Sequence, residues 1–124
     1  MSITNKERVG RALELLREGL YPFVEREMRS IFGDKWMVAA TPSVPEDYTS
    51  KRAVAKILKE DVSALLILMC DKWQDIFKKT LGHAERSLVG ELRDTRNQWA
   101  HNGNFSTDDA YRALDSISRL LSAL

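Results

Sequence analysis

The chain has 124 residues, of which 44% are hydrophobic and 30% are charged, and its formal net charge at pH 7 is +1. Length and composition are typical of one globular domain with one core, so we expect residues 1–124 to form a single domain. Because the net charge is so small, any nucleic-acid contact must come from a local cluster of side chains. No signal-peptide core and no apolar run near the roughly 20 residues of a membrane span is present, which predicts a cytoplasmic protein without a membrane partner.

The single cysteine, Cys70, can form neither an intramolecular disulfide nor a cysteine-based zinc site. It lies in the apolar run from Ala64 to Cys70, where a thiol is more often inert core than a nucleophile. The other side chains that could be drawn as a metal site match no dense ligand motif; they are His83, His101, Asp71 and Asp75. We therefore expect no metal and no cofactor.

The first predicted helix begins at a capping box, in which the Thr4 hydroxyl caps the first turn and the Glu7 carboxylate reaches back. Apolar residues follow at helical spacing: Val9, Leu13, Leu16, Leu20, Val24 and Ile31. Pro22 removes one backbone donor, so we expect a kink near Tyr21 and Pro22. Gly33 is expected to end the helix.

Residues 34–50 contain two prolines and several Ser, Thr and Asp residues, which predicts an irregular connection. Such a segment would be either a functional cover or a tolerated insertion.

Residues 51–59 predict a short extra helix. Asp61 is the expected N-cap of a long helix over residues 62–81, whose apolar centre is typical of the most buried helix of a bundle. Lys78 and Lys79 would complement the C-terminal dipole of this helix, and Gly82 would cap it.

The next predicted helix, from about Ala84 to Ala100, separates two kinds of side chain. At about 100° per residue, four residues share a stripe of roughly 60° that we assign to the core: Leu88, Leu92, Thr95 and Trp99. On the opposite side lie Arg93, Asn97 and His101, spaced i, i+4 and i+8, with Arg96 on the flank. Arg86 belongs to the same outward side. We expect Arg86 and Arg93 to extend a strip that binds RNA phosphates.

After this helix, the segment from His101 to Asn104 has turn chemistry, with Gly103 free to adopt a positive φ. Ser106 precedes acidic residues in the first turn of a last helix, which favours helix initiation. No strand-like alternation competes anywhere in the sequence. The prediction is an all-α fold, a compact up-and-down bundle of four main helices plus one short helix, because the later connections are short.

Arginine, amide and imidazole side chains on one helix face suit RNA cleavage without a metal. The arginine fork matches a phosphate and stabilises the extra charge of the transition state, and histidine can transfer a proton at neutral pH. The reaction needs both a base and an acid, whereas residues 93–101, the motif of this helix, contain one histidine. A two-fold dimer that apposes two motif helices would supply both, so we expect a composite site at a homodimer interface. An ideal helix separates Arg96 from His101 by about 140°, so the two need not converge within one protomer.

A plainer interpretation of the same residues stays open. A histidine at a helix C-terminus commonly complements the helix dipole, and surface arginines usually serve solubility. Likewise, Trp36 and Trp73 are more readily explained as core residues than as platforms for base stacking.

Residues 96–101, with the sequence RNQWAH, resemble the R-x4–6-H signature of the HEPN superfamily, in which a polar residue typically follows the arginine, as Asn97 does here. Residues 81–89, 105–114 and 5–24 are similar to the Swt branch of that superfamily. The resemblance implies an all-α bundle that commonly dimerises and, in many members, a metal-independent ribonuclease that leaves a cyclic phosphate. It also implies catalytic roles for Arg96 and His101, with polar support from Asn97.

The resemblance further implies an effector module of a defence, toxin–antitoxin or RNA-processing system. Swt-type domains often stand at the N-terminus of a larger ATP-binding protein, and the apolar periodicity still running at Leu124 is expected of a module from a longer protein. The implied partners are RNA, a second copy of the chain, and further domains of such a protein or an antitoxin. The alternative is a catalytically inactive HEPN domain that serves dimerisation or RNA binding.

Overall fold

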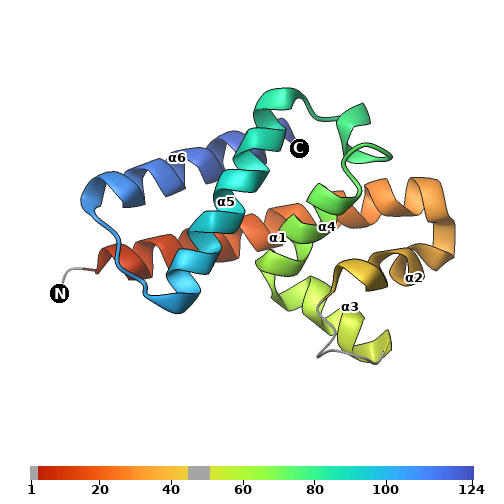
Figure 1. The fold of residues 1–124 in the computed structure, drawn as a ribbon, viewed down its shortest axis with the longest axis horizontal. Coiled ribbons are helices and arrows are strands. Elements are labelled where there is room, and N and C mark those ends of the chain that lie inside the picture. Colours follow the sequence, from red (N-terminus) through yellow and green to blue (C-terminus); the bar gives the residue numbers. More distant parts are fainter. Residues whose placement is uncertain (1–2, 45–50) are drawn as a thin grey trace.

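The computed structural model describes residues 3–44 and 51–124, with side chains from Val54 onward in the second range. Within these residues the protein contains helices and no strands, which confirms the predicted all-α bundle (Figure 1). The helices are α1 (Asn5–Phe32), α2 (Trp36–Ala40), α3 (Lys51–Glu60), α4 (Val62–Asp71), α5 (His83–His101) and α6 (Thr107–Ala123). Three short 3-10 turns accompany them: Gly33–Lys35, Thr41–Ser43 and Phe77–Lys79. In this part of the chain, no helix combines the length and the apolar character needed to cross a bilayer.

The ends of α1 lie where local chemistry predicts them. The Thr4 hydroxyl accepts a hydrogen bond from the backbone N–H of Glu7 (3.1 Å), and Gly33 ends the helix with φ 59°. Between these ends the helix is continuous through Pro22, so the missing proline N–H does not break it. The predicted cap of α4 is also confirmed, since the Asp61 side chain accepts from the Ser63 N–H. Helix α6 begins where predicted, and Ser106 caps it by accepting from the Asp109 N–H.

The irregular connection predicted for residues 34–50 is wrong for its first half, because this half contains the helix α2 between two 3-10 turns. The side chains of Trp36 and Ala40, one helical turn apart, are both buried. Their packing onto the body stabilises a five-residue helix that would be too short to persist alone. The second half of the prediction, residues 45–50, lies outside the described residues.

The single helix predicted over residues 62–81 is also wrong. Helix α4 ends at Asp71, whose carboxylate accepts a hydrogen bond from the Ser43 hydroxyl (2.8 Å). Turn residues and the 3-10 turn Phe77–Lys79 then lead to α5. Trp73, Ile76 and Phe77 are nevertheless buried, so the apolar spacing reflects a shared core rather than one continuous helix. The lysines predicted at the C-terminus of this helix therefore do not lie at the end of α4, and Gly82 precedes α5 as its N-cap.

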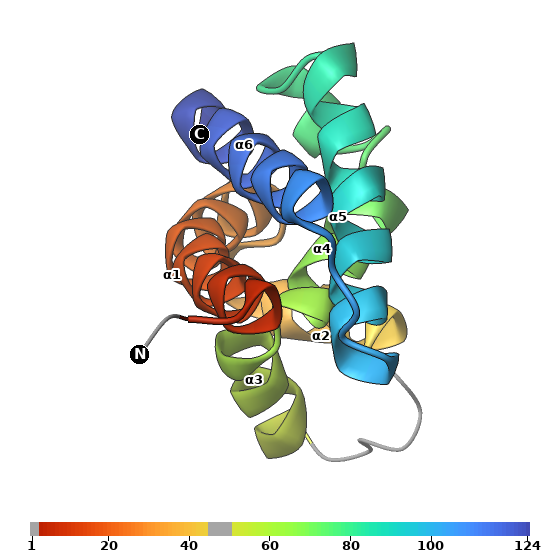
Figure 2. The same ribbon diagram turned by 90° about the vertical axis from the view of Figure 1, so that its left-hand side faces the viewer.

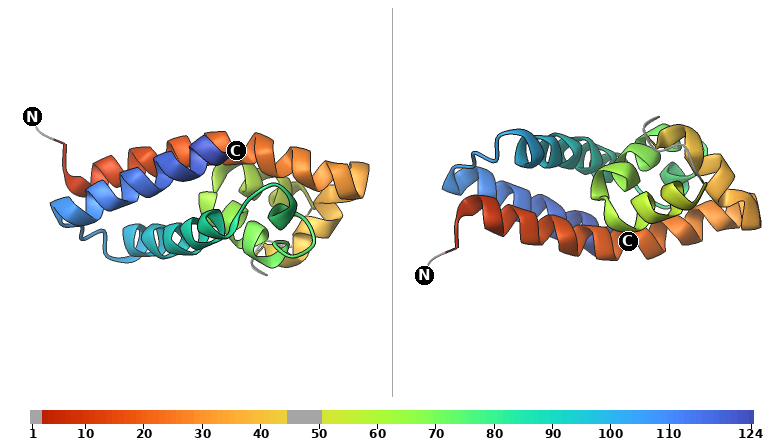
Figure 3. Two further views of the ribbon diagram at one scale, coloured as in Figure 1. Left: turned by 90° about the horizontal axis from the view of Figure 1, so that it is seen from above. Right: turned by 90° about the horizontal axis from the view of Figure 1, so that it is seen from below.

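Helix α5 packs mainly against α4 and α6, and its C-terminal half approaches α1 and the junction of α3 with α4, where the candidate site lies (Figure 2). Helix α6 lies along the N-terminal part of α1 in the same direction, because the Asn5 amide donates to the Phe105 carbonyl (3.1 Å) and Gly19 faces Leu121 further along (Figure 3). The short connection makes α5 and α6 antiparallel neighbours, as predicted.

Candidate functional site

Helix α5 is anchored on its inner side, but less deeply than predicted. Leu92 is fully buried, whereas Leu88, Thr95 and Trp99 are half-buried. Trp99 lies at the edge of the core, where its Nε1 donates to the backbone carbonyl of Lys6 (3.2 Å). The tryptophan predicted as buried thus joins α5 to the first turn of α1 and keeps part of its indole exposed.

Gly10 allows this contact, because a side chain at this position of α1 would collide with the indole. A Cβ built on Gly10 would lie 2.9 Å from Trp99 Nε1 and 3.2 Å from two ring carbons. A Cβ on Gly90 in α5 would meet only Arg86, at 3.6 Å, which is ordinary contact. Gly90 is therefore a matched control for a substitution at Gly10, because both glycines are helical and only Gly10 is closely packed.

We expect Gly10→Ala to lower the free energy of unfolding by about 1 to 2 kcal/mol, because overpacking outweighs the gain in helix propensity. Gly90→Ala should instead raise it by up to about 1 kcal/mol, since only the propensity changes. Urea unfolding monitored by circular dichroism measures both. Equal effects of the two substitutions would contradict the close packing of Trp99 against α1.

The C-terminal end of α5 is well defined, which fixes the position of His101. The backbone N–H groups of Asn102 and Gly103 both donate to the carbonyl of Gln98, at 3.0 and 2.8 Å. Gly103 adopts φ 64°, as the sequence predicts, and turns the chain toward α6. His101 is the last residue of α5 and its side chain is exposed, so this imidazole is available to a ligand or a second protein copy.

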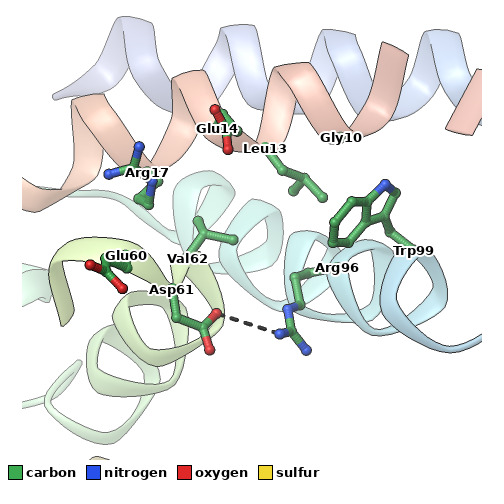
Figure 4. A pocket seen from close by; sticks show the side chains of 9 residues that line it. All are labelled: Gly10, Leu13, Glu14, Arg17, Glu60, Asp61, Val62, Arg96 and Trp99. Atoms are coloured by element: carbon green, nitrogen blue, oxygen red, sulfur yellow. Dashed lines mark ion pairs between the residues drawn. The ribbon is translucent and has the colours of Figure 1, made fainter. Parts of the chain in front are cut away.

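Arg96 lies in a cleft between α1, the start of α4 and α5 (Figure 4). Its guanidinium Nη2 lies 3.5 Å from Oδ1 of Asp61, in an ion pair between α5 and the N-cap of α4. The other residues that line the cleft are Gly10, Leu13, Glu14, Arg17, Glu60, Val62 and Trp99. Three carboxylates and two guanidinium groups thus give the cleft a small excess of negative charge. A ligand that binds Arg96 would also lie close to the carboxylate of Asp61.

The other predicted site residues lie outside this cleft. Asn97 is exposed next to Arg96, and it lies one turn before His101 on the same face of α5. In the described part of the chain, neither the Asn97 amide nor the His101 imidazole makes a hydrogen bond. Arg93 is half-buried one turn before Asn97. The motif therefore presents one side chain in a cleft and two on the adjoining exposed surface.

Arg86 is held apart from the motif. Its guanidinium carbon lies 5.8 Å from the centre of the Trp73 ring, a cation–π contact that covers one side of this buried tryptophan. It is ten residues before Arg96, which is about 15 Å along a helix. Arg86 thus packs against the protein, and only a ligand that extends along α5 could reach both arginines.

The two histidines of the chain lie at opposite ends of α5, since His83 is its first residue and His101 its last. At 1.5 Å per residue they are about 27 Å apart, too far to act on one phosphodiester. One chain therefore supplies a single imidazole at the end of α5 that carries Arg96. In the described residues, no three His, Cys, Asp or Glu side chains are grouped so that they could hold a metal ion.

Sequence reasoning missed Asp61 as a site residue. Asp61 was recognisable as a helix cap, but nothing in its spacing indicates that it faces Arg96, 35 residues further along the chain. The same holds for Glu14 and Arg17 of α1, which are near Arg96 only because α1 passes the junction of α3 and α4. No local sequence signal could have revealed these neighbours.

The comparison with protein families gives one match, to the model described as Swt1-like HEPN, over residues 11–124. The match includes the whole of α5 and most of the residues that line the cleft. No curated protein and no solved structure matches the chain.

Proposed function

Because the chain belongs to the Swt1-like HEPN family, we propose that it is a metal-independent endoribonuclease domain whose site is completed by a second copy. Membership of this family supports an RNA-related nuclease module in general terms. One observation carries the finer proposal. Arg96, Asn97 and His101 all lie within the last six residues of α5, whereas the other histidine of the chain is at the opposite end of this helix, about 27 Å away.

In the proposed reaction, the ribose 2′-oxygen attacks the phosphorus while a base removes its proton. The new P–O2′ bond forms as the P–O5′ bond breaks, and an acid protonates the departing 5′-oxygen. The products are a 2′,3′-cyclic phosphate and a free 5′-hydroxyl. No metal, oxidant or second substrate is needed, so the protein must supply only proton transfer and charge stabilisation.

The motif residues have distinct roles in this reaction. Arg96 binds the scissile phosphate and stabilises the negative charge of the transition state, for which a guanidinium fork is well suited. His101 transfers protons. Asn97 orients the phosphate or the imidazole. Arg93 and, for RNA that continues along α5, Arg86 bind flanking phosphates.

The dimer follows from the proton transfers that the reaction requires. Two groups must act, one as base and one as acid, and the exposed end of one α5 provides a single imidazole. A two-fold axis close to this end would bring together two imidazoles and two guanidinium groups around one phosphodiester. Each chain would then contribute half of the site.

A subunit-mixing experiment tests this composite site. Parent protein is equilibrated with a tenfold excess of His101→Ala chains and assayed with excess RNA. If each site needs both copies, most parent chains are in mixed dimers and cleavage per parent chain should fall at least fivefold. Addition of His83→Ala chains, which change the distant histidine, should not lower it. Unchanged cleavage with the His101→Ala chains would show that one chain suffices.

We place this activity in an effector module of a defence, toxin–antitoxin or RNA-processing system. The alternative is a catalytically inactive domain that dimerises a larger protein or binds RNA. It has one structural argument in its favour, because Asp61 already pairs with the arginine that would bind phosphate. Growth on induced expression separates the two functions, since an active nuclease should slow growth and its His101→Ala variant should not.

A further inference from the structure

Asp61 joins the candidate site to the junction of α3 and α4. Its backbone N–H donates to the Ile57 carbonyl at the end of α3 (2.8 Å), and its Oδ1 accepts from the Ser63 N–H at the start of α4 (2.9 Å). The same Oδ1 lies 3.5 Å from Nη2 of Arg96. The carboxylate that Arg96 meets is thus fixed by two hydrogen bonds of its own residue.

Arg96 makes this contact through only one of its nitrogen atoms. In the part of the chain that the structure describes, no other ion pair and no hydrogen bond involves its guanidinium. Within the described residues, the remaining donors of the fork thus have no partner and are available to a phosphate. A free arginine side chain has about 2 kcal/mol of rotamer entropy, so a fixed carboxylate at one nitrogen can select the useful orientation beforehand.

The other charged groups of the cleft do not compete for this role. Arg17, the second guanidinium, donates to the Lys59 carbonyl (2.7 Å) and pairs with Glu18. Glu14 and Glu60 line the same cleft, and among the described residues no ion pair links either of them to Arg96. Asp61 is thus the carboxylate with a direct contact to the motif.

The contact contributes little to stability. The side chains of Arg96 and Asp61 are 26% and 37% exposed, and exposed ion pairs are usually worth about 0 to 1 kcal/mol. Removal of the charge on Asp61 therefore leaves the fold intact. Removal of this charge instead changes the orientation of the Arg96 guanidinium.

We propose, on the basis of the ribonuclease function above, that Asp61 is a positioning residue: it holds the Arg96 guanidinium so that its free donors face the scissile phosphate. Asp61 itself does not touch the RNA. A displacement of about 1 Å at a reacting group can cost a hundredfold in rate, so this orientation affects turnover more than binding.

The test compares two isosteric substitutions that remove one negative charge each from the cleft. Asp61→Asn keeps the N-cap, because asparagine caps helices as well as aspartate, and Glu60→Gln is the charge-matched control. We expect Asp61→Asn to lower kcat for RNA cleavage about 10- to 100-fold without raising KM, and Glu60→Gln to leave kcat within about twofold. Equal kcat values for the two variants would overturn the proposal, as would a faster Asp61→Asn variant or an effect on KM alone.

A second measurement separates this proposal from the ribonuclease function. In ¹⁵N NMR spectra, the Nε–Hε group of Arg96 is assigned by its loss in Arg96→Lys, and its order parameter is compared between variants. Lower order in Asp61→Asn than in Glu60→Gln would support Asp61 as the anchor, and equal order would overturn it. A parent protein that does not cleave RNA would refute the proposed function, and the NMR comparison would still decide whether Asp61 positions Arg96.

Discussion

Replacement of His101 by alanine is expected to lower RNA cleavage by about two to four orders of magnitude. This imidazole is the only one at the end of α5 that carries Arg96, and its loss removes the proton-transfer group from both halves of the proposed site. The fold should be unaffected, because His101 is exposed at the end of α5 and its favourable dipole interaction is worth at most about 1 kcal/mol. The measurement is the cleavage rate of a labelled RNA.

His83→Ala is the matched control, because it removes the other histidine of α5 and leaves the motif intact. Cleavage by this variant should equal that of the parent. Circular dichroism and sedimentation should show the same helicity and the same self-association for all three proteins. If His101→Ala cleaves RNA like the parent while His83→Ala does not, the active imidazole lies at the wrong end of the helix and the proposed site is refuted.

Arg96→Ala is expected to lower kcat about 100- to 1000-fold, as the loss of one group that stabilises transition-state charge does in other enzymes. Arg96→Lys should recover only part of this loss, because lysine keeps the charge but not the planar fork that binds two phosphate oxygens. Since Arg96 pairs with a half-exposed carboxylate, neither variant should lose more than about 1 kcal/mol of stability.

Arg93→Ala serves as the control for Arg96, because it removes a guanidinium one turn away that lies outside the cleft. It should weaken RNA binding a few-fold and reduce its salt dependence, with kcat nearly unchanged. An equal loss of kcat in Arg93→Ala and Arg96→Ala would mean that Arg96 contributes only general positive charge. The assignment of Arg96 to the scissile phosphate would then be wrong.

The parts of the fold that the sequence predicts correctly depend on local chemistry. Thr4 and Asp61 cap helices through their own side chains, and Gly33 and Gly103 adopt the positive φ that other residues avoid. The break after Asp71 was not predictable in this way. Apolar residues continue at helical spacing through the turns that follow, because the core that they share is formed by distant segments.

In the candidate site, too, the features set by local spacing were predictable and those set by distant segments were not. The common face of Asn97 and His101 follows from helical spacing within one element, and the structure preserves it. The depth of Trp99 and the partner of Arg96 depend on where α1 and the α3–α4 junction meet α5. Such contacts between distant segments are set by tertiary packing, so spacing along the chain cannot reveal them.

Cleavage of RNA in the presence of EDTA, with analysis of the product ends, tests the central claim most directly. The account predicts that the parent protein cleaves without metal, leaves a 2′,3′-cyclic phosphate and a 5′-hydroxyl, and loses this activity in Arg96→Ala and His101→Ala. Cleavage that EDTA abolishes, or products with a 3′-hydroxyl, would contradict it. A well-folded dimer that binds RNA but does not cleave it would contradict it as well and would favour the inactive module.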